Sequence, residues 1–117
     1  MNTAFKAAAL LGGTAVLAGA FGAHGLKAML SEHNLEVWRT AVLYQFFHAL
    51  ALLAITSVPQ QKAWRLSVWA WILGVLIFCG SLYALALGAP SKLGMITPIG
   101  GLALCVGWFN LLRFNAQ

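Results

Sequence analysis

Four stretches of this chain contain no Lys, Arg, Asp or Glu: residues 7–26, 40–61, 66–91 and 93–112. Each stretch is about 20 to 26 residues long. Because a helix rises about 1.5 Å per residue and the hydrocarbon core of a bilayer is about 30 Å thick, each stretch can cross a membrane. A soluble chain of 117 residues could not bury four helices that lack polar faces. The sequence therefore predicts an all-α, polytopic membrane protein.

Composition supports the same class. Hydrophobic residues make up 62% of the chain and charged residues only 8%, whereas an ordinary soluble domain has about a quarter charged residues. The net charge is +5, but the seven basic residues are spread along the chain and form no patch. This pattern is not that of a nucleic-acid-binding protein. We expect the lipid bilayer as the partner of the chain, and no nucleic acid.

We predict a single four-helix transmembrane domain over residues 1–117, with spans at about 4–23, 37–58, 66–87 and 95–112. The longest connection lies between the first two spans and holds both acidic residues, Glu32 and Glu36. Its apolar residues recur at helical spacing, which predicts a short interfacial helix there, with Asn34 as the N-cap of the helix that follows.

The basic residues give the orientation of the chain. One side of the membrane would hold both termini, and we expect it to be the cytoplasmic side because it carries more basic residues. Trp38, Trp64 and Trp108 fall near span ends, where an aromatic belt would lie. The basic residues on the side of the termini are Lys6, Lys62, Arg65 and Arg113, against Lys27, Arg39 and Lys92 on the other side.

Small residues follow one face of the first span and one face of the third. In lipid, helices associate through close backbone contact at such residues. The fourth span begins with Thr97, a candidate helix cap, and Pro98, which suits a first helical turn. The glycines predicted to pack helices together are Gly12, Gly19, Gly74, Gly88, Gly100 and Gly101.

Polar residues within spans are costly in lipid and mark candidate sites. Those of this chain fall in the membrane half away from the termini, which predicts one polar half and one almost wholly apolar half. The members of this polar cluster are His24, Tyr44, Gln45, His48, Ser81 and Thr97.

Three interpretations of the polar cluster stay open. Its members could hydrogen-bond to one another and hold the helices together. They could line a small-molecule or proton site, with His48 as the titratable group. A metal or haem site on His24 and His48 is disfavoured, because their predicted depths in the membrane differ by about 12 Å. We expect no metal and no cofactor.

Other chemistry has little support in the sequence. Cys79 and Cys105 lie within spans and have no metal-ligand spacing, so we interpret them as small buried residues. The chain has no nucleophile elbow, phosphate-binding loop, zinc motif or paired catalytic carboxylates. We therefore expect a protein that is not an enzyme.

Four motifs resemble those of a known family. They are GAFGAHGLK at 19–27, W-x-T-A-V-x-Y-Q-x-x-H-A-L-A-L-L at 38–53, GSLYALAL at 80–87, and TPIGG followed by GW within 97–108. Their order and spacing resemble the YgdD/YwdK family of small bacterial inner-membrane proteins, which has mitochondrial relatives. The resemblance covers nearly the whole chain. It implies a multi-pass inner-membrane protein of four helices, without an assigned biochemical function.

The same resemblance carries over residues of the polar cluster, together with Tyr83 and Pro98. That agreement favours a shared site. Our hypothesis is a non-enzymatic protein that uses the cluster to bind a lipid, a small ligand or a membrane-protein partner. The alternative is a small transporter or channel for a small molecule or proton, which with four helices would work as a homo-oligomer.

Overall fold

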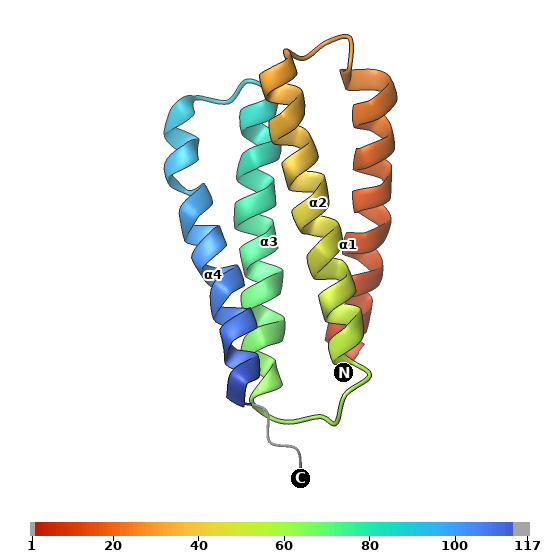
Figure 1. Cartoon of the computed structure of the whole chain (residues 1–117), viewed down its shortest axis with the longest axis vertical. Helices are drawn as coiled ribbons and strands as arrows, with labels where there is room; N and C mark the ends of the chain where they lie inside the picture. Colours follow the sequence, from red (N-terminus) through yellow and green to blue (C-terminus); the bar gives the residue numbers. More distant parts are fainter. Residues whose placement is uncertain (1, 114–117) are drawn as a thin grey trace.

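The computed structural model describes residues 2–113, and the described residues form helices and turns without a β-strand. Four long helices lie antiparallel, α1 (Asn2–Phe21), α2 (Glu32–Ile55), α3 (Trp64–Ala86) and α4 (Thr97–Asn110). The start of α1, the end of α4 and the connection between α2 and α3 lie at the same end of the molecule, called here the end of the termini (Figure 1). Four segments are long and apolar enough to span a membrane: Thr3–Leu26, Glu32–Ile55, Trp64–Ala86 and Ser91–Arg113. The predicted all-α fold with four membrane-spanning helices is confirmed.

The predicted interfacial helix between the first two spans is wrong. Residues Gly22–Leu26 instead continue α1 as one π-helical turn, and the Ser31 Oγ accepts the Asn34 N–H (3.1 Å) as the N-cap of α2. Ser31, not Asn34, is therefore the cap. The apolar residues that indicated a separate amphipathic helix are divided between the end of α1, the turn and the start of α2. Leu26, only 2% exposed, packs with Leu35 inside the protein.

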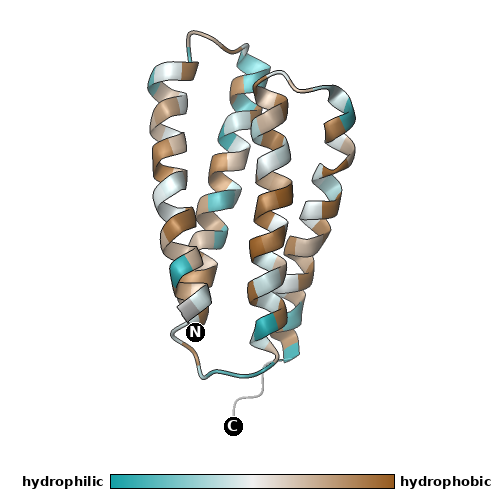
Figure 2. Cartoon of the chain, turned by 180° about the vertical axis from the view of Figure 1, so that it is seen from behind, coloured by the Kyte–Doolittle hydropathy of each residue, from teal (hydrophilic) through white to brown (hydrophobic). Residues whose placement is uncertain are grey.

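The two middle helices of the chain form the centre of the fold. α1 packs mainly on α2, α2 on α3, and α3 on α4. The largest buried side chains, Trp64, Trp71, Leu52 and Val75, come from α2 and α3. Many large hydrophobic side chains of all four helices are exposed, for example Leu17, Phe47, Leu76 and Phe109. Hydrophilic residues are frequent near the helix ends and in the connections (Figure 2). This distribution suits a protein whose sides contact lipid.

Five of the six predicted packing glycines face another helix. A Cβ on Gly12 would lie 3.7 Å from the Ala49 Cβ, and one on Gly19 would lie 3.4 Å from the Val42 side chain. The remaining three lie between α3 and α4: Gly74 against Leu104, Gly100 against the Phe78 backbone, and Gly101 against the Phe78 ring.

Gly88 is not a packing glycine, and its predicted role is wrong. A Cβ built on it would have no other atom within 4 Å, whereas its φ of +104° is a conformation that only glycine adopts easily. Gly88 follows the end of α3, and the next amide, Ala89 N–H, donates to the Ala84 carbonyl (2.9 Å). Gly88 thus ends the helix in a left-handed cap.

The aromatic belt is also only partly correct. Trp38 and Trp64 lie at span ends but are buried, and their indole N–H groups donate to the carbonyls of Ala18 and Pro59 (both 2.9 Å). Trp108, at 45% exposed, is the one of these three that faces lipid in part. Protein carbonyls meet the hydrogen-bonding need of Trp38 and Trp64 that we had assigned to the membrane interface.

Candidate functional site

Gln45 connects three helices. Its Nε2 donates to the Leu11 carbonyl (2.9 Å) and to the Thr14 Oγ1 (2.7 Å), both on α1, while its Oε1 accepts the Tyr83 hydroxyl of α3 (2.7 Å). The amide has two N–H donors and one carbonyl oxygen, and all three groups are used. Gln45 therefore holds α1 and α3 against α2 and presents no spare donor to a ligand.

Ser81 and Thr97 form a second, separate pair between α3 and the start of α4. Their hydroxyl oxygens are 2.5 Å apart, and the Ser81 hydroxyl also donates to the Phe78 carbonyl (2.9 Å). Because Ser81 has one hydrogen to donate, Thr97 is the donor within the pair. Thr97 does not cap α4 as predicted, since the start of that helix has no side-chain cap.

His48, on α2, is buried on the side that faces α4, and two contacts fix its tautomer. Its Nδ1 lies 2.7 Å from the Tyr44 carbonyl, and the Trp108 Nε1–H donates to its Nε2 (2.9 Å). A carbonyl can only accept and an indole N–H can only donate, so Nδ1 carries the hydrogen and Nε2 carries none. The neighbouring Tyr44 ring lies nearly parallel to the imidazole and also contacts Phe78. His48 is therefore neutral in this arrangement and holds Trp108.

His24 does not join the other polar residues. It lies in the π-helical turn that follows α1, it is exposed, and its side chain has no hydrogen-bond partner among residues 2–113. Within the same described range, no three His, Cys, Asp or Glu side chains are grouped closely enough to hold a metal ion. The predicted cluster is thus three separate sets, and His24 lies outside them.

The membrane half near the termini contains a polar network that the sequence analysis missed. Ser67, fully buried, donates to the Gly107 carbonyl (2.7 Å), and Asn110, 7% exposed, donates through Nδ2 to Ser67 Oγ (2.9 Å) and to the Ala63 carbonyl (2.7 Å). The prediction of an almost wholly apolar half is therefore wrong. The signal was an Asn and a Ser inside predicted spans.

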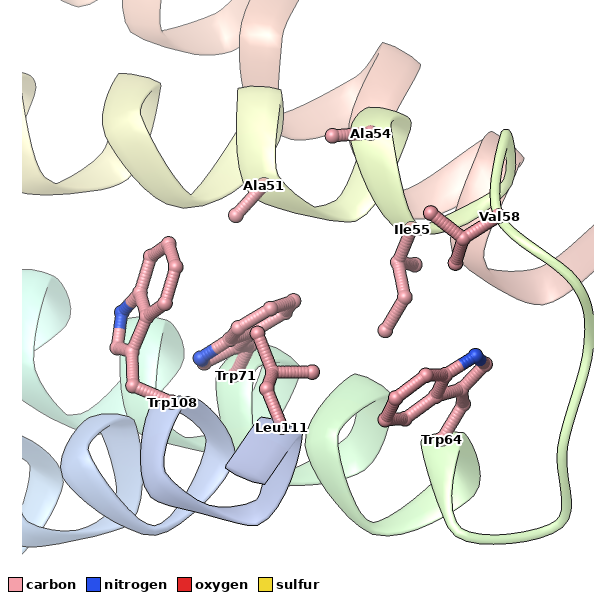
Figure 3. Close-up of a pocket in the computed structure, with 8 residues that line it drawn as sticks. All are labelled: Ala51, Ala54, Ile55, Val58, Trp64, Trp71, Trp108 and Leu111. Carbon is pink, nitrogen blue, oxygen red and sulfur yellow. The ribbon is translucent and has the colours of Figure 1, made fainter. Parts of the chain in front are cut away.

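A cavity of about 270 Å³ lies between α2, α3 and α4 in that same half. Figure 3 shows three indole rings along one side of it, with smaller side chains from α2 opposite. The Trp71 and Trp108 ring centres are 4.8 Å apart and their planes are tilted by 54°. The lining residues are Ala51, Ala54, Ile55, Val58, Trp64, Trp71, Trp108 and Leu111.

The cavity and the polar residues meet at one side chain. Trp108 lines the cavity, and its Nε1–H is the group that His48 accepts. Trp71 lies against Gly107, where a Cβ would come within 2.5 Å of its indole, and its own buried Nε1–H has no partner among the described residues. The two indoles are thus positioned differently. A hydrogen bond to His48 holds Trp108, whereas Trp71 packs against Gly107, which has no side chain to block it.

Comparison with known proteins decides the family. Residues 18–101 match the family described as "Protein of unknown function (DUF423)". This chain belongs to the DUF423 family. A UPF0382 membrane protein of Staphylococcus aureus is 44% identical over 100 residues, which cover 84% of this chain and 82% of the relative. A UPF0382 membrane protein of Haemophilus influenzae is 44% identical over 105 residues, covering 88% of this chain and 85% of the relative.

A relative from Bacillus subtilis is one of the two proteins after which the resembled family is named. The UPF0382 membrane protein YwdK is 39% identical over 102 residues, which cover 84% of this chain and 83% of YwdK. The resemblance to the YgdD/YwdK family is therefore confirmed. The prediction of a membrane protein from a family without an assigned function is confirmed as well. No solved structure matches this DUF423 chain.

Proposed function

We propose that this chain is a non-enzymatic binding protein of the bacterial inner membrane, and that its ligand is a flat, apolar ring compound dissolved in the bilayer. The observation that supports the proposal is the cavity lined by Trp64, Trp71 and Trp108. A pocket of this kind, apolar and placed between helices of a bundle, is the usual form of a small-molecule site. The binding role is the one we expect from sequence, but its site is the cavity instead of the polar cluster.

The shape of the lining favours a ring over a flexible chain. Ala51 and Ala54 supply only methyl groups on the α2 side, which leaves space opposite the indoles. Ring–ring contacts add about 0.5–1.5 kcal/mol beyond the burial of area, provided that the rings meet tilted or offset. An apolar cavity of about 150 Å³ is enough to bind benzene, so a cavity of about 270 Å³ has room for one or two fused rings.

His48 has the role of a positioning residue in this proposal. Trp108 is half exposed, so packing alone restrains its ring less than it restrains the buried Trp71. The hydrogen bond from Trp108 to His48 Nε2 restrains the ring instead. Tyr44, whose carbonyl holds His48 Nδ1, acts one step further from the cavity. The polar residues of α2 thereby contribute to the site without touching the ligand.

Photolabelling tests the proposal. The purified protein in lipid nanodiscs is illuminated with a naphthalene that carries a diazirine, and the labelled residues are located by peptide mass spectrometry. We expect label on residues 51–58 and 108–111, reduced by an excess of plain naphthalene. Ala51→Phe fills the cavity and should abolish the label, while Ala20→Phe, the same change on an exposed face of α1, should leave it unchanged.

Two results would contradict the proposal. Label spread evenly over lipid-facing residues such as Leu17 and Leu102 would indicate simple partition into the bilayer. Equal labelling of Ala51→Phe and the parent protein would place the compound elsewhere. If Ala51→Phe loses helix content by circular dichroism, Ala54→Leu serves as a smaller blocking substitution at the same cavity.

The transporter alternative makes a different prediction for the oligomeric state of the protein. The internal hydrogen bonds of Gln45, Ser81 and His48 favour a binding protein over a transporter, which needs polar groups free to meet its substrate. Native mass spectrometry from nanodiscs should give a monomer, and an oligomer that carries a proton flux in vesicles would support the transporter.

We also propose cytoplasmic termini, so a reporter fused to the C-terminus should be active only inside the cell.

A further inference from the structure

A second, shallower groove runs along the outside of α3 and α4 at the end of the molecule that holds the termini. Its volume is about 740 Å³, and it is lined by Leu66, Leu102, Cys105, Val106, Phe109, Asn110 and Arg113. From Leu102 to Arg113 the helical rise gives a length of about 16 Å. This length is about half of the 30 Å hydrocarbon core, which is the depth of one lipid leaflet.

Arg113 lies at the outer end of this groove, and a chain of hydrogen bonds fixes its position. Ser67 donates its only hydroxyl hydrogen to the Gly107 carbonyl, so its oxygen can accept from Asn110 Nδ2. The second Nδ2 hydrogen of Asn110 goes to the Ala63 carbonyl, which leaves Oδ1 facing Arg113. Oδ1 then accepts the Arg113 Nε–H (2.8 Å). The buried Asn110 therefore orients the guanidinium.

Orientation through Nε leaves the terminal nitrogens of Arg113 without a partner among residues 2–113. A guanidinium has five N–H donors, and Nε supplies only one of them. The remaining donors form a planar fork that matches the spacing of two phosphate oxygens. An anion bound there would lie directly above the apolar part of the groove, beside Phe109.

The charge of this end of the molecule suits an anion. Four of the seven basic residues lie at this end, and both acidic residues, Glu32 and Glu36, begin α2 at the opposite end. Neither Lys62 nor Arg65 has a side-chain partner among the described residues. The basic residues at the end of the termini are Lys6, Lys62, Arg65 and Arg113.

We infer that this groove is a specific site for an anionic phospholipid. One acyl chain lies along Leu102, Val106 and Phe109, and the phosphate is bound by the Arg113 guanidinium that Asn110 orients. The length of the groove and the charge at its end select a phospholipid over a free phosphate or a protein helix. The site is distinct from the tryptophan-lined cavity, on other faces of α3 and α4, and does not depend on it.

Native mass spectrometry of the protein with dioleoyl phosphatidylglycerol or dioleoyl phosphatidylcholine tests the inference. We expect one retained phosphatidylglycerol and weaker retention of phosphatidylcholine. Arg113→Gln should raise the dissociation constant for phosphatidylglycerol about tenfold, because a bidentate charge-assisted contact is lost. Arg65→Gln makes the same charge change at the same end outside the groove, and should change the constant less than about twofold.

Two further variants separate the parts of the site. Val106→Trp fills the groove on a lipid-facing position without changing charge, and should lower phosphatidylglycerol retention as much as Arg113→Gln does. Arg113→Lys keeps the charge but loses the planar fork of donors. Its dissociation constant for phosphatidylglycerol should therefore lie between those of Arg113→Gln and the parent protein. Circular dichroism and thermal melting establish that each variant is folded.

Three results would overturn the inference. Equal losses in Arg113→Gln and Arg65→Gln would mean that only the overall charge attracts the lipid. Unchanged retention in Val106→Trp would remove the acyl chain from the groove. Displacement of the lipid by an excess of inorganic phosphate would show a site for phosphate alone. All the variants should keep naphthalene labelling of the tryptophan-lined cavity, so failure here is distinguishable from failure of the proposed function.

Discussion

The two outer helices are attached to the two inner helices in different ways. Where α1 meets α2, side chains reach across to backbone carbonyls, from Trp38 to Ala18 and from Gln45 to Leu11 (both 2.9 Å). The glycines Gly12 and Gly19 leave ordinary contact distances. Where α3 meets α4, Ser67 and Asn110 also bond across to backbone carbonyls, those of Gly107 and Ala63 (both 2.7 Å). Here, in addition, the backbones themselves approach, and Gly100 lies directly against the Phe78 main chain.

The difference shows that a stripe of small residues does not by itself define how closely two helices pack. Water does not drive helices together inside a bilayer, so dispersion contacts and hydrogen bonds must hold them. The α3–α4 pair gains much of its contact area from backbone approach at Gly74 and Gly100. The α1–α2 pair stands further apart at Gly12 and Gly19 and gains three hydrogen bonds from the Gln45 and Trp38 side chains. Alanine at these glycines should therefore cost more stability in the α3–α4 pair than in the α1–α2 pair.

The largest effect should come from Gly100→Ala. Its Cβ would overlap the Phe78 backbone, which cannot move aside as a side chain can, so α4 must shift. We expect a loss of about 2–4 kcal/mol in the free energy of unfolding. Unfolding in mixed micelles with increasing dodecyl sulfate measures this loss.

The neighbouring glycine supplies the control for that substitution. A Cβ on Gly101 would lie 3.6 Å from the Phe78 ring, an ordinary contact, so Gly101→Ala should cost less than about 1 kcal/mol. Equal losses at Gly100 and Gly101 would mean that helix flexibility, and not the close backbone approach, accounts for the effect.

An intermediate effect should come from Gln45→Leu, which keeps the approximate size of the side chain and removes three hydrogen bonds. Hydrogen bonds in membrane proteins average about 0.6 kcal/mol each, with a maximum of about 1.7. We expect a loss of about 2 kcal/mol, part of it from the buried Tyr83 hydroxyl left without its acceptor.

Tyr83→Phe, alone and combined with Gln45→Leu, measures how much of the stability lost in Gln45→Leu comes from the Tyr83 hydrogen bond. It removes the hydroxyl that Gln45 accepts, so the double variant should be less destabilised than the sum of the two single variants. Additive losses would show that Gln45 and Tyr83 do not act on each other, so that the effect of Gln45→Leu comes from its bonds to α1 alone.

The smallest effect should come from Gly12→Ala. The new methyl would meet the Ala49 Cβ at 3.7 Å, which is a favourable van der Waals distance. Alanine also favours a helix by about 1 kcal/mol over glycine. We expect a change between zero and about 1 kcal/mol of stabilisation in the same micelle titration. A loss above 1 kcal/mol would mean that α1 and α2 are as closely packed as α3 and α4.

The sequence predicted the helices well because charge is excluded from the hydrocarbon core at every position of a span. It failed at Glu32, where a charged residue begins α2 at the water interface and the apolar residues around it seemed to form their own helix. Gly12 and Gly100 look alike in a sequence, because the distance to the partner helix depends on residues such as Ala49 and Phe78 that no local pattern identifies.

The polar residues were predicted to face inward, but their partners were not. Gln45 and His48 are three residues apart, yet one turns to α1 and α3 and the other to Trp108 of α4. The cavity was not predictable from the sequence, because its walls come from three helices. Asn110 and Ser67 are polar residues inside predicted spans, a signal that the sequence analysis did not use.

The central claim is that three indoles, one of them held by His48, line a cavity for an apolar ring. The five indole N–H signals of protein labelled with ¹⁵N-tryptophan in nanodiscs, followed as naphthalene is added, test it directly. We predict saturable shifts for Trp64, Trp71 and Trp108, absent in Ala51→Phe, while Trp38 and the lipid-facing Trp69 stay unchanged. Non-saturating shifts of Trp69 as large as those of Trp108 would contradict the claim.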